Sequence, residues 1–197
     1  MTITIQRCHW CGTDPDYVHY HDTVWGRPVR DSQELFAKLC LDGQQAGLSW
    51  ITILRKQTNY ENAFCQFNPY DIVQMPTVQR DALIHNAGII RNRLKIEAIF
   101  KNAEAYIALA EKGIAFNDFL WSFSAGKPRI FARQGGDIPA TDEVSDAMAK
   151  ALKKAGFSFV GSTICYAFMQ AVGMVNDHTV HCHCYEPVCA EMREFSL

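Results

Sequence analysis

The segment Cys40-Leu41-Asp42-Gly43-Gln44-Gln45-Ala46-Gly47-Leu48-Ser49-Trp50 joins two strongly helical parts of the chain. It is apolar around a few polar groups, namely a carboxylate and two carboxamides, and it ends in a tryptophan. This mixture suits a pocket for a small molecule or a base, which needs flat apolar walls and a few directional groups. If the first helix ends at Gly43, Asp42 lies where the helix dipole disfavours a carboxylate. The alternative is a plain interhelical turn with an exposed aspartate and a buried tryptophan.

The sequence on both sides of this segment has the period of amphipathic helices. A helix is predicted to begin at Asp31, with Glu34 completing a capping box, and to bury Leu35, Phe36 and Leu39. The same periodicity and the turn residues predict further helices. They cover about residues 48–67, 77–86, 94–113, 117–123, 142–155 and 160–175. Strand signals are sparse, and 124–142 reads as one long loop, so the sequence predicts an all-α fold.

Composition narrows the class of protein. The chain has 197 residues, of which 48% are hydrophobic and 20% are charged, which is typical of one globular domain. The net charge of −2 argues against a surface coated in basic residues. No apolar signal segment and no run of about 18 apolar residues is present, so we expect a soluble, cytoplasmic protein that does not enter membranes. In such a protein the eight cysteines are expected as thiols or metal ligands.

Cysteine and histidine gather near both ends of the chain in spacings that suit a metal. Cys8 and His21 form a C-x12-H pair, and His178 and Cys182 form an H-x3-C pair. Two such pairs supply the four ligands of a closed structural zinc site, whereas a catalytic zinc would need an open position. Several neighbours compete as ligands: Cys11, His181, His183 and Cys184. The sequence therefore predicts a metal site and leaves the choice of ligands open, with unrelated thiols and surface histidines as the alternative.

A second constellation lies in residues 83–95. An apolar helix ends at a glycine turn that includes Gly88, and the next helix starts among Arg91, Arg93 and Lys95. Free backbone N–H groups at a helix start, together with basic side chains, form an anion site for which a phosphate is the natural ligand. The alternative is an ordinary αα-hairpin with a solvated basic turn.

Several segments, taken in order, resemble one known family. They are Cys8-His9-Trp10, Tyr20-His21-Asp22, Trp25-Gly26, Gly43 to Trp50, Gly88-Ile89-Ile90-Arg91, Phe119-Leu120-Trp121-Ser122-Phe123, Phe159-Val160-Gly161-Ser162-Thr163-Ile164-Cys165-Tyr166 and Val175-Asn176-Asp177-His178. Together they resemble bacterial DNA-3-methyladenine glycosylase I, up to about Tyr185.

The resemblance implies a helix-hairpin-helix DNA glycosylase fold as a single domain over 1–185, followed by a flexible tail over 186–197. It implies a monofunctional, monomeric enzyme that removes 3-methyladenine from alkylated double-stranded DNA. It also implies one structural zinc that joins the N- and C-terminal segments. The residues carried over are, for the zinc, Cys8, His21, His178 and Cys182, and for the base pocket, Trp10, Tyr17, Tyr20, Trp25 and Trp50. Asp42 is the candidate catalytic residue, expected to accept a hydrogen bond from the base, and the hairpin residues expected on DNA phosphates are Gly88, Arg91, Arg93 and Lys95.

Two positions depart from the family pattern. Asp42 stands where the family typically has glutamate, one methylene longer, and Ile90 stands where the hairpin pattern has a second glycine. No second carboxylate is placed to activate water, so catalysis is expected mainly from binding that destabilises the cationic, extruded nucleotide. Two rival functions are a zinc-stabilised DNA-binding module without catalysis and a zinc hydrolase of a small substrate. The run of aromatic residues argues against the binding module.

Overall fold

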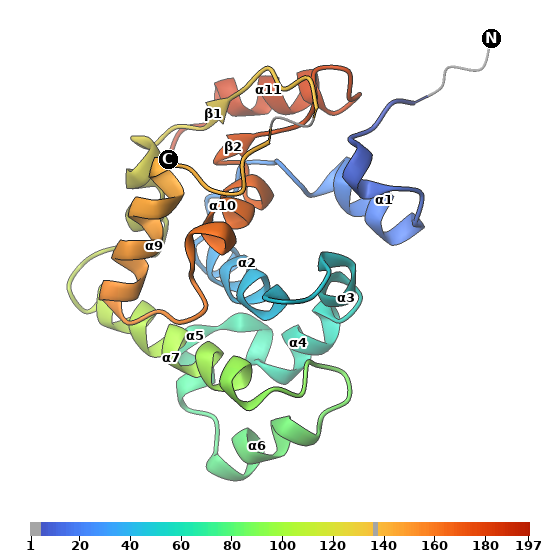
Figure 1. Ribbon diagram of the computed structural model, residues 1–197. Helices are drawn as coiled ribbons and strands as arrows, with labels where there is room; N and C mark the ends of the chain where they lie inside the picture. The colour runs from blue at the N-terminus through green and yellow to red at the C-terminus, as the bar shows by residue number, and fades with distance from the viewer. Residues whose placement is uncertain (1–4, 136–137) are drawn as a thin grey trace.

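The computed structural model describes residues 5–135 and 138–197, and within them helices dominate (Figure 1). The α-helices are α1 (Pro15–Thr23), α2 (Ser32–Gln45), α3 (Trp50–Leu54), α4 (Gln57–Ala63), α5 (Pro69–Val73), α6 (Thr77–Ala82), α7 (Arg93–Ala110), α8 (Phe116–Trp121), α9 (Glu143–Ala155), α10 (Ser162–Ala171) and α11 (Tyr185–Glu194). Short 3-10 turns are η1 (His9–Cys11), η2 (Cys65–Phe67), η3 (Leu83–His85) and η4 (Ser122–Ser124). In the described part of the chain, the extended pairing consists of β1 (Arg129–Ile130) alongside β2 (Val175–Asn176), in parallel, and an isolated parallel bridge between Arg133 and Thr179. The all-α prediction is confirmed.

Helix α2 lies at the centre of the molecule, with α10 and α7 packed against it (Figure 1). The Asp31 side chain caps it by accepting a hydrogen bond from the Glu34 backbone N–H at 2.8 Å, which is one of the two hydrogen bonds of the predicted capping box. Its side chains Leu35, Phe36 and Leu39 are fully buried in the main core. Because this helix is held on several sides, the residues at its C-terminal end are held in place as well.

The helix does not end at Gly43, the position that the sequence analysis considered for its end. The helix passes through Gly43 and continues to Gln45, and the left-handed backbone lies at Gly47, with φ of 75°. Gly43 is needed for a different reason, since a Cβ there would lie 3.2 Å from the Cβ of Phe159. The missing side chain therefore lets the segment before α10 approach α2 closely. Asp42 lies within the last turn of α2 and not after it.

The basic hairpin connects α6 and η3 to α7 through residues 86–92. Its glycine is required by close packing, because a Cβ on Gly88 would lie 3.0 Å from the Asn59 and Asn86 side chains. The Tyr60 hydroxyl accepts the N–H of Ile90 at 3.1 Å and donates to Oε1 of Gln44 at 3.1 Å. The hairpin is thereby connected to the central helix α2.

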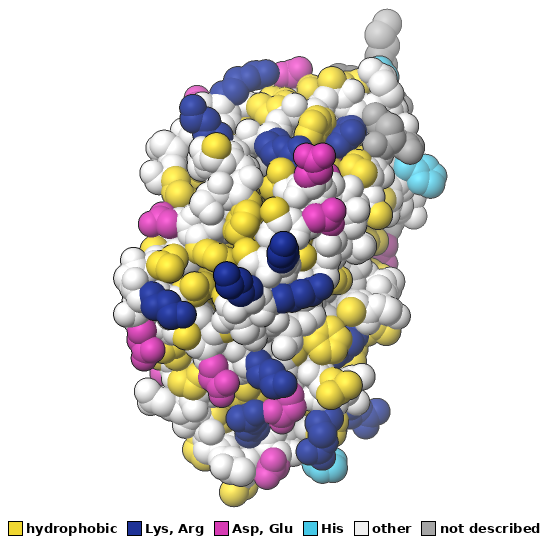
Figure 2. All heavy atoms as spheres, turned by 60° about the vertical axis from the view of Figure 1, so that its left-hand side comes forward, with side chains coloured by type: hydrophobic (Ala, Val, Ile, Leu, Met, Phe, Trp, Pro, Cys, Tyr) yellow, Lys and Arg dark blue, Asp and Glu magenta, His cyan; other side chains and the backbone are white. Residues whose placement is uncertain are grey.

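Segments near the two ends of the chain contact each other, where the backbone N–H of His183 donates to the Gln6 oxygen at 2.9 Å. β1, β2 and α11 lie together at the top of Figure 1, and α1 lies beside them on the right. Residues 186–197 differ from the expected flexible tail, because they form most of α11 and bury Val188, Cys189 and Met192. None of the described helices is long and apolar enough to cross a membrane. The face over α9 mixes basic, acidic and apolar side chains (Figure 2), as the small net charge indicates.

Candidate active site and metal centre

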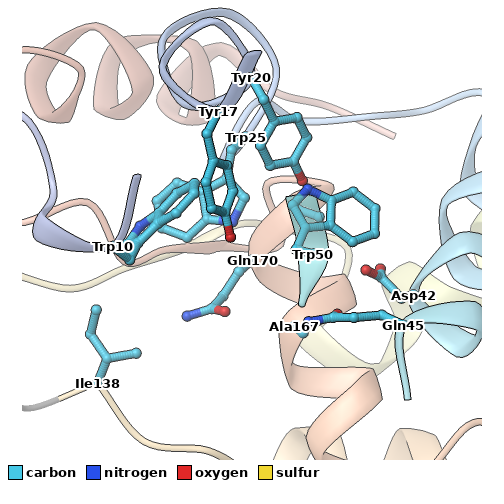
Figure 3. Close-up of a pocket in the computed structure, with 11 residues that line it drawn as sticks. Trp10, Tyr17, Tyr20, Trp25, Asp42, Gln45, Trp50, Ile138, Ala167 and Gln170 are labelled. Atoms are coloured by element: carbon cyan, nitrogen blue, oxygen red, sulfur yellow. The ribbon is translucent and has the colours of Figure 1, made fainter. Parts of the chain in front are cut away.

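A cavity of about 320 Å³ opens between α1, α2, α3 and α10 (Figure 3). Every aromatic residue predicted for a base pocket lines it, and Asp42 lines it too. The full lining is Trp10, Tyr17, Tyr20, Trp25, Asp42, Gln45, Trp50, Ile138, Ala167, Gln170 and Ala171. Residues more than 150 positions apart in the sequence thus meet around one space, and its walls are mostly aromatic.

Edge-to-face contacts hold the aromatic walls in place. The ring of Trp10 meets that of Tyr17 at 5.1 Å with an interplanar angle of 65°, and that of Trp25 at 4.9 Å with an angle of 66°. Across the cavity, the rings of Tyr20 and Trp50 lie 5.4 Å apart. Such tilted pairs stabilise one another and leave ring faces available for another flat group.

Asp42 is buried in this cavity, with 3% of its surface exposed. Its Oδ2 atom has no hydrogen-bond partner among the described residues. Burial raises the pKa of this carboxyl to about 8, although the positive charge of Lys38 lowers it. An exposed aspartate in a plain turn, the alternative reading of this segment, is therefore excluded. An unpartnered buried carboxyl is costly in a folded protein, so its retention here points to a ligand.

Two further buried polar atoms lack a partner in the described structure, and both face the same cavity. They are the indole nitrogens Nε1 of Trp10 and Trp50, which are hydrogen-bond donors. The cavity therefore offers an acceptor or acid on one side and two donors elsewhere. A flat heterocycle that carries both donors and acceptors would satisfy all three.

Sequence reasoning missed the remaining lining residues. Gln45 lies in the decisive segment and was not nominated, whereas Ile138 lies in the long loop. Ala167, Gln170 and Ala171 lie on α10, where an apolar helical pattern gives no sign of a site. Of these residues, only Gln170 gave a sequence signal for a site, because it is a carboxamide in a largely apolar helix.

The metal-like pairs converge at a second buried cluster. The side chains of Cys8, His21, His178 and Cys182 are all buried, and their ligand atoms lie within 4.8 Å of one another. Sγ of Cys182 lies 3.5 Å from Nε2 of His21 and 3.5 Å from Nδ1 of His178. The cluster joins the N-terminal segment to the C-terminal segment, as predicted, and its donor set is that of a metal site.

Each histidine of this cluster has its second nitrogen occupied. Nδ1 of His21 lies 2.7 Å from Oδ1 of Asp22, and Nε2 of His178 lies 3.3 Å from the backbone oxygen of Trp25. Such contacts fix the ring orientation and leave the other nitrogen as a ligand. The backbone N–H groups of Thr179 and Cys184 donate to Sγ of Cys8 and Cys182, respectively.

The competing ligands take other places. The thiol of Cys11 donates to the backbone oxygen of Cys8 at 3.2 Å, and His181 is exposed. His183 and Cys184 form a second group with His21 and Asp22, which overlaps the first at His21. Asp22 in that group is held by Arg7 in an ion pair of 2.8 Å, which lowers the pKa of the Asp22 carboxyl.

The structure separates the basic residues of the hairpin. Arg91 and Arg93 are exposed, as a phosphate contact requires. Lys95 is buried, and its Nζ donates to the backbone oxygens of Gln44 and Ala46, both at 2.7 Å. The predicted phosphate contact of Lys95 is therefore wrong. Its ammonium instead satisfies carbonyl groups at the C-terminal end of α2, where the helix dipole favours a cation.

Comparison with known sequences agrees with this arrangement. A sequence model of the family described as "Methyladenine glycosylase" matches residues 10–185. DNA-3-methyladenine glycosylase 1 of Escherichia coli (strain K12) is 51% identical over 182 residues, which are 92% of this chain and 97% of that protein. DNA-3-methyladenine glycosylase of Haemophilus influenzae is 51% identical over 179 residues, covering 90% of this chain and 97% of that protein.

Solved structures agree as well. A crystal structure of 3-methyladenine DNA glycosylase I superposes with a TM-score of 0.89 at 53% identity, covering 91% of this chain and all of that one (100%). The glycosylase I of Staphylococcus aureus, solved to explain 3-methyladenine recognition, gives a TM-score of 0.87 at 37% identity, covering 91% of this chain and 96% of that one. By its sequence, its fold and the convergence of its cavity residues, the chain belongs to the methyladenine glycosylase family.

Proposed function

We propose that this protein is a DNA glycosylase that extrudes 3-methyladenine from alkylated double-stranded DNA and hydrolyses its N-glycosidic bond. The observation that carries the proposal is the buried carboxyl of Asp42, unpartnered inside an aromatic cavity. Neither rival function needs such a group. A DNA-binding module has no use for a buried cavity, and a zinc hydrolase would place its substrate at the metal.

The cavity suits a flat cationic base. Extrusion from the duplex costs a few kcal/mol, and stacking on aromatic side chains returns about 1–3 kcal/mol per base. The positive charge of an N3-alkylated adenine is favoured both by ring faces and by a carboxylate. Trp50 and Tyr20 supply such rings beside Asp42, so neutral adenine gains less from the same site.

The protonation of Asp42 is expected to change when the base binds. With a pKa of about 8, the carboxyl is mostly neutral at pH 7 in the free protein. A cationic base beside it favours the carboxylate, which accepts a hydrogen bond from the exocyclic amine. Binding then releases a proton. The bond to the base is broken with its electron pair going to the base, which leaves as a neutral molecule, so the demand on an acid catalyst is small.

We further propose that the buried Cys and His cluster holds one structural Zn²⁺. In a tetrahedral zinc site with bonds of about 2.3 Å to sulfur and about 2.0 Å to nitrogen, a sulfur and a nitrogen lie about 3.5 Å apart. Sγ of Cys8 and Nδ1 of His178 are 3.5 Å apart, as are the two Cys182 pairs. The ion would join the two ends of the chain and take no part in the reaction, because its ligands fill the coordination sphere.

The DNA backbone is proposed to run over the hairpin, with Arg91 and Arg93 on phosphates and Gly88 allowing the hairpin to pack closely against the Asn59 side chain. The enzyme is proposed to act as a monomer in the cytoplasm. These exposed arginines are adjacent to residues tied to α2 through Tyr60 and Gln44. The residues proposed to contact the DNA backbone are thus linked by hydrogen bonds to the helix that carries Asp42.

Release of bases from methylated DNA tests the activity. Chromatography should show free 3-methyladenine with the wild-type protein and a much lower yield with Asp42→Asn, which keeps size and removes the acid. Exposed Asp71→Asn is a matched control and should behave as the wild type. If wild-type protein binds methylated DNA and releases no base, the non-catalytic binding module is the better description.

A further inference from the structure

The cavity holds one polar side chain whose orientation is fixed by a buried network outside the cavity. Nε2 of Gln170 donates to Oδ2 of Asp177 at 2.9 Å. Asp177 is fully buried, and it is further held by the Tyr166 hydroxyl at 2.7 Å and by Nε of Arg133 at 2.9 Å. A carboxylate only accepts hydrogen bonds, so it must face the NH₂ side of the carboxamide. The carbonyl oxygen Oε1 of Gln170 is then left for the cavity, into which Figure 3 shows this side chain extending.

The position of Gln170 in the cavity suits the sugar rather than the base. Asp42, the recognition group for the base, is 3% exposed and lies on the Trp50 side, whereas Gln170 is partly exposed and lies on the Trp10 side (Figure 3). A base whose amine reaches the buried Asp42 therefore has its sugar toward the more open side. That is where the attacking water must be held, and none of the described lining residues on that side is a carboxylate.

We infer that Gln170 is the residue that positions the attacking water, with Asp177 fixing the carboxamide so that its oxygen accepts a hydrogen bond from that water. This inference rests on the proposed glycosylase function. The water oxygen forms the new bond to C1′ of the sugar. The C1′–N9 bond breaks with its electron pair going to the cationic base, which leaves neutral, and the water proton passes to solvent at the cavity mouth. A carboxamide suffices, because the departing base is already activated by its charge.

The network explains why a neutral acceptor can hold one orientation. A free glutamine side chain interchanges its oxygen and nitrogen at little cost. Here the interchange would turn the carbonyl oxygen of Gln170 toward the carboxylate of Asp177, and two acceptors would face each other. Tyr166 and Gln170 lie one turn apart on α10, so a single rigid helix presents both groups to Asp177. Such fixed geometry is what converts a bound water into an oriented nucleophile.

The test compares Gln170→Met, which keeps length and removes the acceptor, with Gln74→Met, the same change at an exposed site. Single-turnover release of 3-methyladenine from DNA should fall on the order of tenfold or more for Gln170→Met only. Affinity for free 3-methyladenine should stay within about twofold, which also shows that the variant is folded. In a water–methanol mixture, methanol should capture a larger share of the sugar in the variant, because water no longer holds a reserved position.

Three outcomes are decisive. Wild-type release with unchanged release by Gln170→Met overturns the inference and leaves the proposed function standing. An equal loss of free-base affinity and release rate assigns Gln170 to base binding and also overturns it. Absence of release by the wild type removes the proposed function itself.

Asp177→Asn, which offers the carboxamide an uncharged partner, should give an intermediate loss of rate together with the same shift toward methanol. An unchanged product ratio in both variants contradicts a water site at Gln170.

Discussion

The metal-like cluster and the aromatic cavity lie close together, but they differ in how far their buried polar groups are hydrogen-bonded. In the cluster, the second nitrogen of each histidine has a partner, and backbone N–H groups donate to both sulfurs. In the cavity, Oδ2 of Asp42 and two indole nitrogens are buried without partners among the described residues. A fully satisfied buried network fixes structure, whereas buried groups left unsatisfied cost stability and are retained where a ligand satisfies them. The first region is built for rigidity and the second for binding.

Removing the metal should give the largest effect. We expect Cys182→Ser, or exposure to a strong chelator, to lower the free energy of unfolding by several kcal/mol, because structural zinc sites contribute on the order of 10 kcal/mol. Base release should persist at low temperature in molecules that stay folded, because the four ligands close the coordination sphere and leave the ion no open position for substrate or water. Metal analysis and thermal unfolding give the readouts.

Cys11→Ser is the matched control for that experiment. Its thiol donates to the backbone oxygens of Cys8 and Gly12, so the variant should keep one zinc per chain. Loss of zinc from Cys11→Ser would place Cys11 among the ligands. A protein that loses turnover immediately on chelation while remaining fully folded would contradict a purely structural ion.

Asp42→Asn should give the next effect, with opposite signs for binding and stability. A charge-assisted hydrogen bond is worth about 1.5–3 kcal/mol, so affinity for free 3-methyladenine should fall on the order of tenfold or more. Asp42→Glu, which restores the residue typical of the family, should bind at least as well as the wild type. Isothermal titration of free base into all three proteins measures this, and equal affinities would leave recognition to the aromatic walls alone.

The effect of Asp42→Asn on the free energy of unfolding depends on pH, and its direction follows from the pKa of Asp42. Because the folded-state pKa of Asp42, about 8, lies above the ordinary value of 3.8, the folded protein holds this proton more tightly than the unfolded chain. Its stability is therefore unaffected below about pH 4 and falls as pH rises toward 8, by up to about 1.4 kcal/mol per unit. The Asp42→Asn variant does not lose stability in this way, because its amide does not ionise. Thermal unfolding from pH 5 to 8 should show Asp42→Asn gaining on the wild type, and parallel curves would mean that Asp42 is ionised throughout.

Some residues of the cluster and the cavity could be predicted from the sequence, and others could not. The ligand spacings predicted a metal site, and the resemblance to the glycosylase family supplied its four ligands and the five aromatic wall residues, whereas Asp42 was singled out from its own segment. Lys95 was placed wrongly because its partners, the carbonyls of Gln44 and Ala46, lie about 50 positions away along the chain. Gln170 was missed although its partner Asp177 lies only seven positions away, because the pattern of α10 does not show which of its side chains face the cavity. A role that depends on tertiary packing cannot be recognised from the local sequence alone.

The C-terminal helix α11 is another part of the structure that the sequence analysis did not predict. Val188, Cys189 and Met192 have helical spacing and could have predicted α11, yet they lie beyond the part of the chain that resembles the family. Reading that boundary as the end of ordered structure was the error. The residues pack beside the metal-like cluster, where Val188 and Met192 join Cys8 and Cys182 in one buried group.

The smallest predicted effect separates the two kinds of basic residue in the hairpin. Each phosphate contact contributes a slope of about 0.9 to the dependence of the logarithm of DNA affinity on the logarithm of salt concentration. Arg91→Ala and Arg93→Ala should each reduce that slope by about one and weaken binding to all sequences alike. Lys95→Met should leave the slope unchanged and lower the melting temperature, because its ammonium satisfies carbonyls of α2 that would otherwise stay buried without donors. Binding titrations at several salt concentrations, with melting curves for the same proteins, distinguish the two. A reduced slope for Lys95→Met with no loss of stability would show that this lysine leaves its buried position to reach the DNA, and the separation drawn from the structure would then fail.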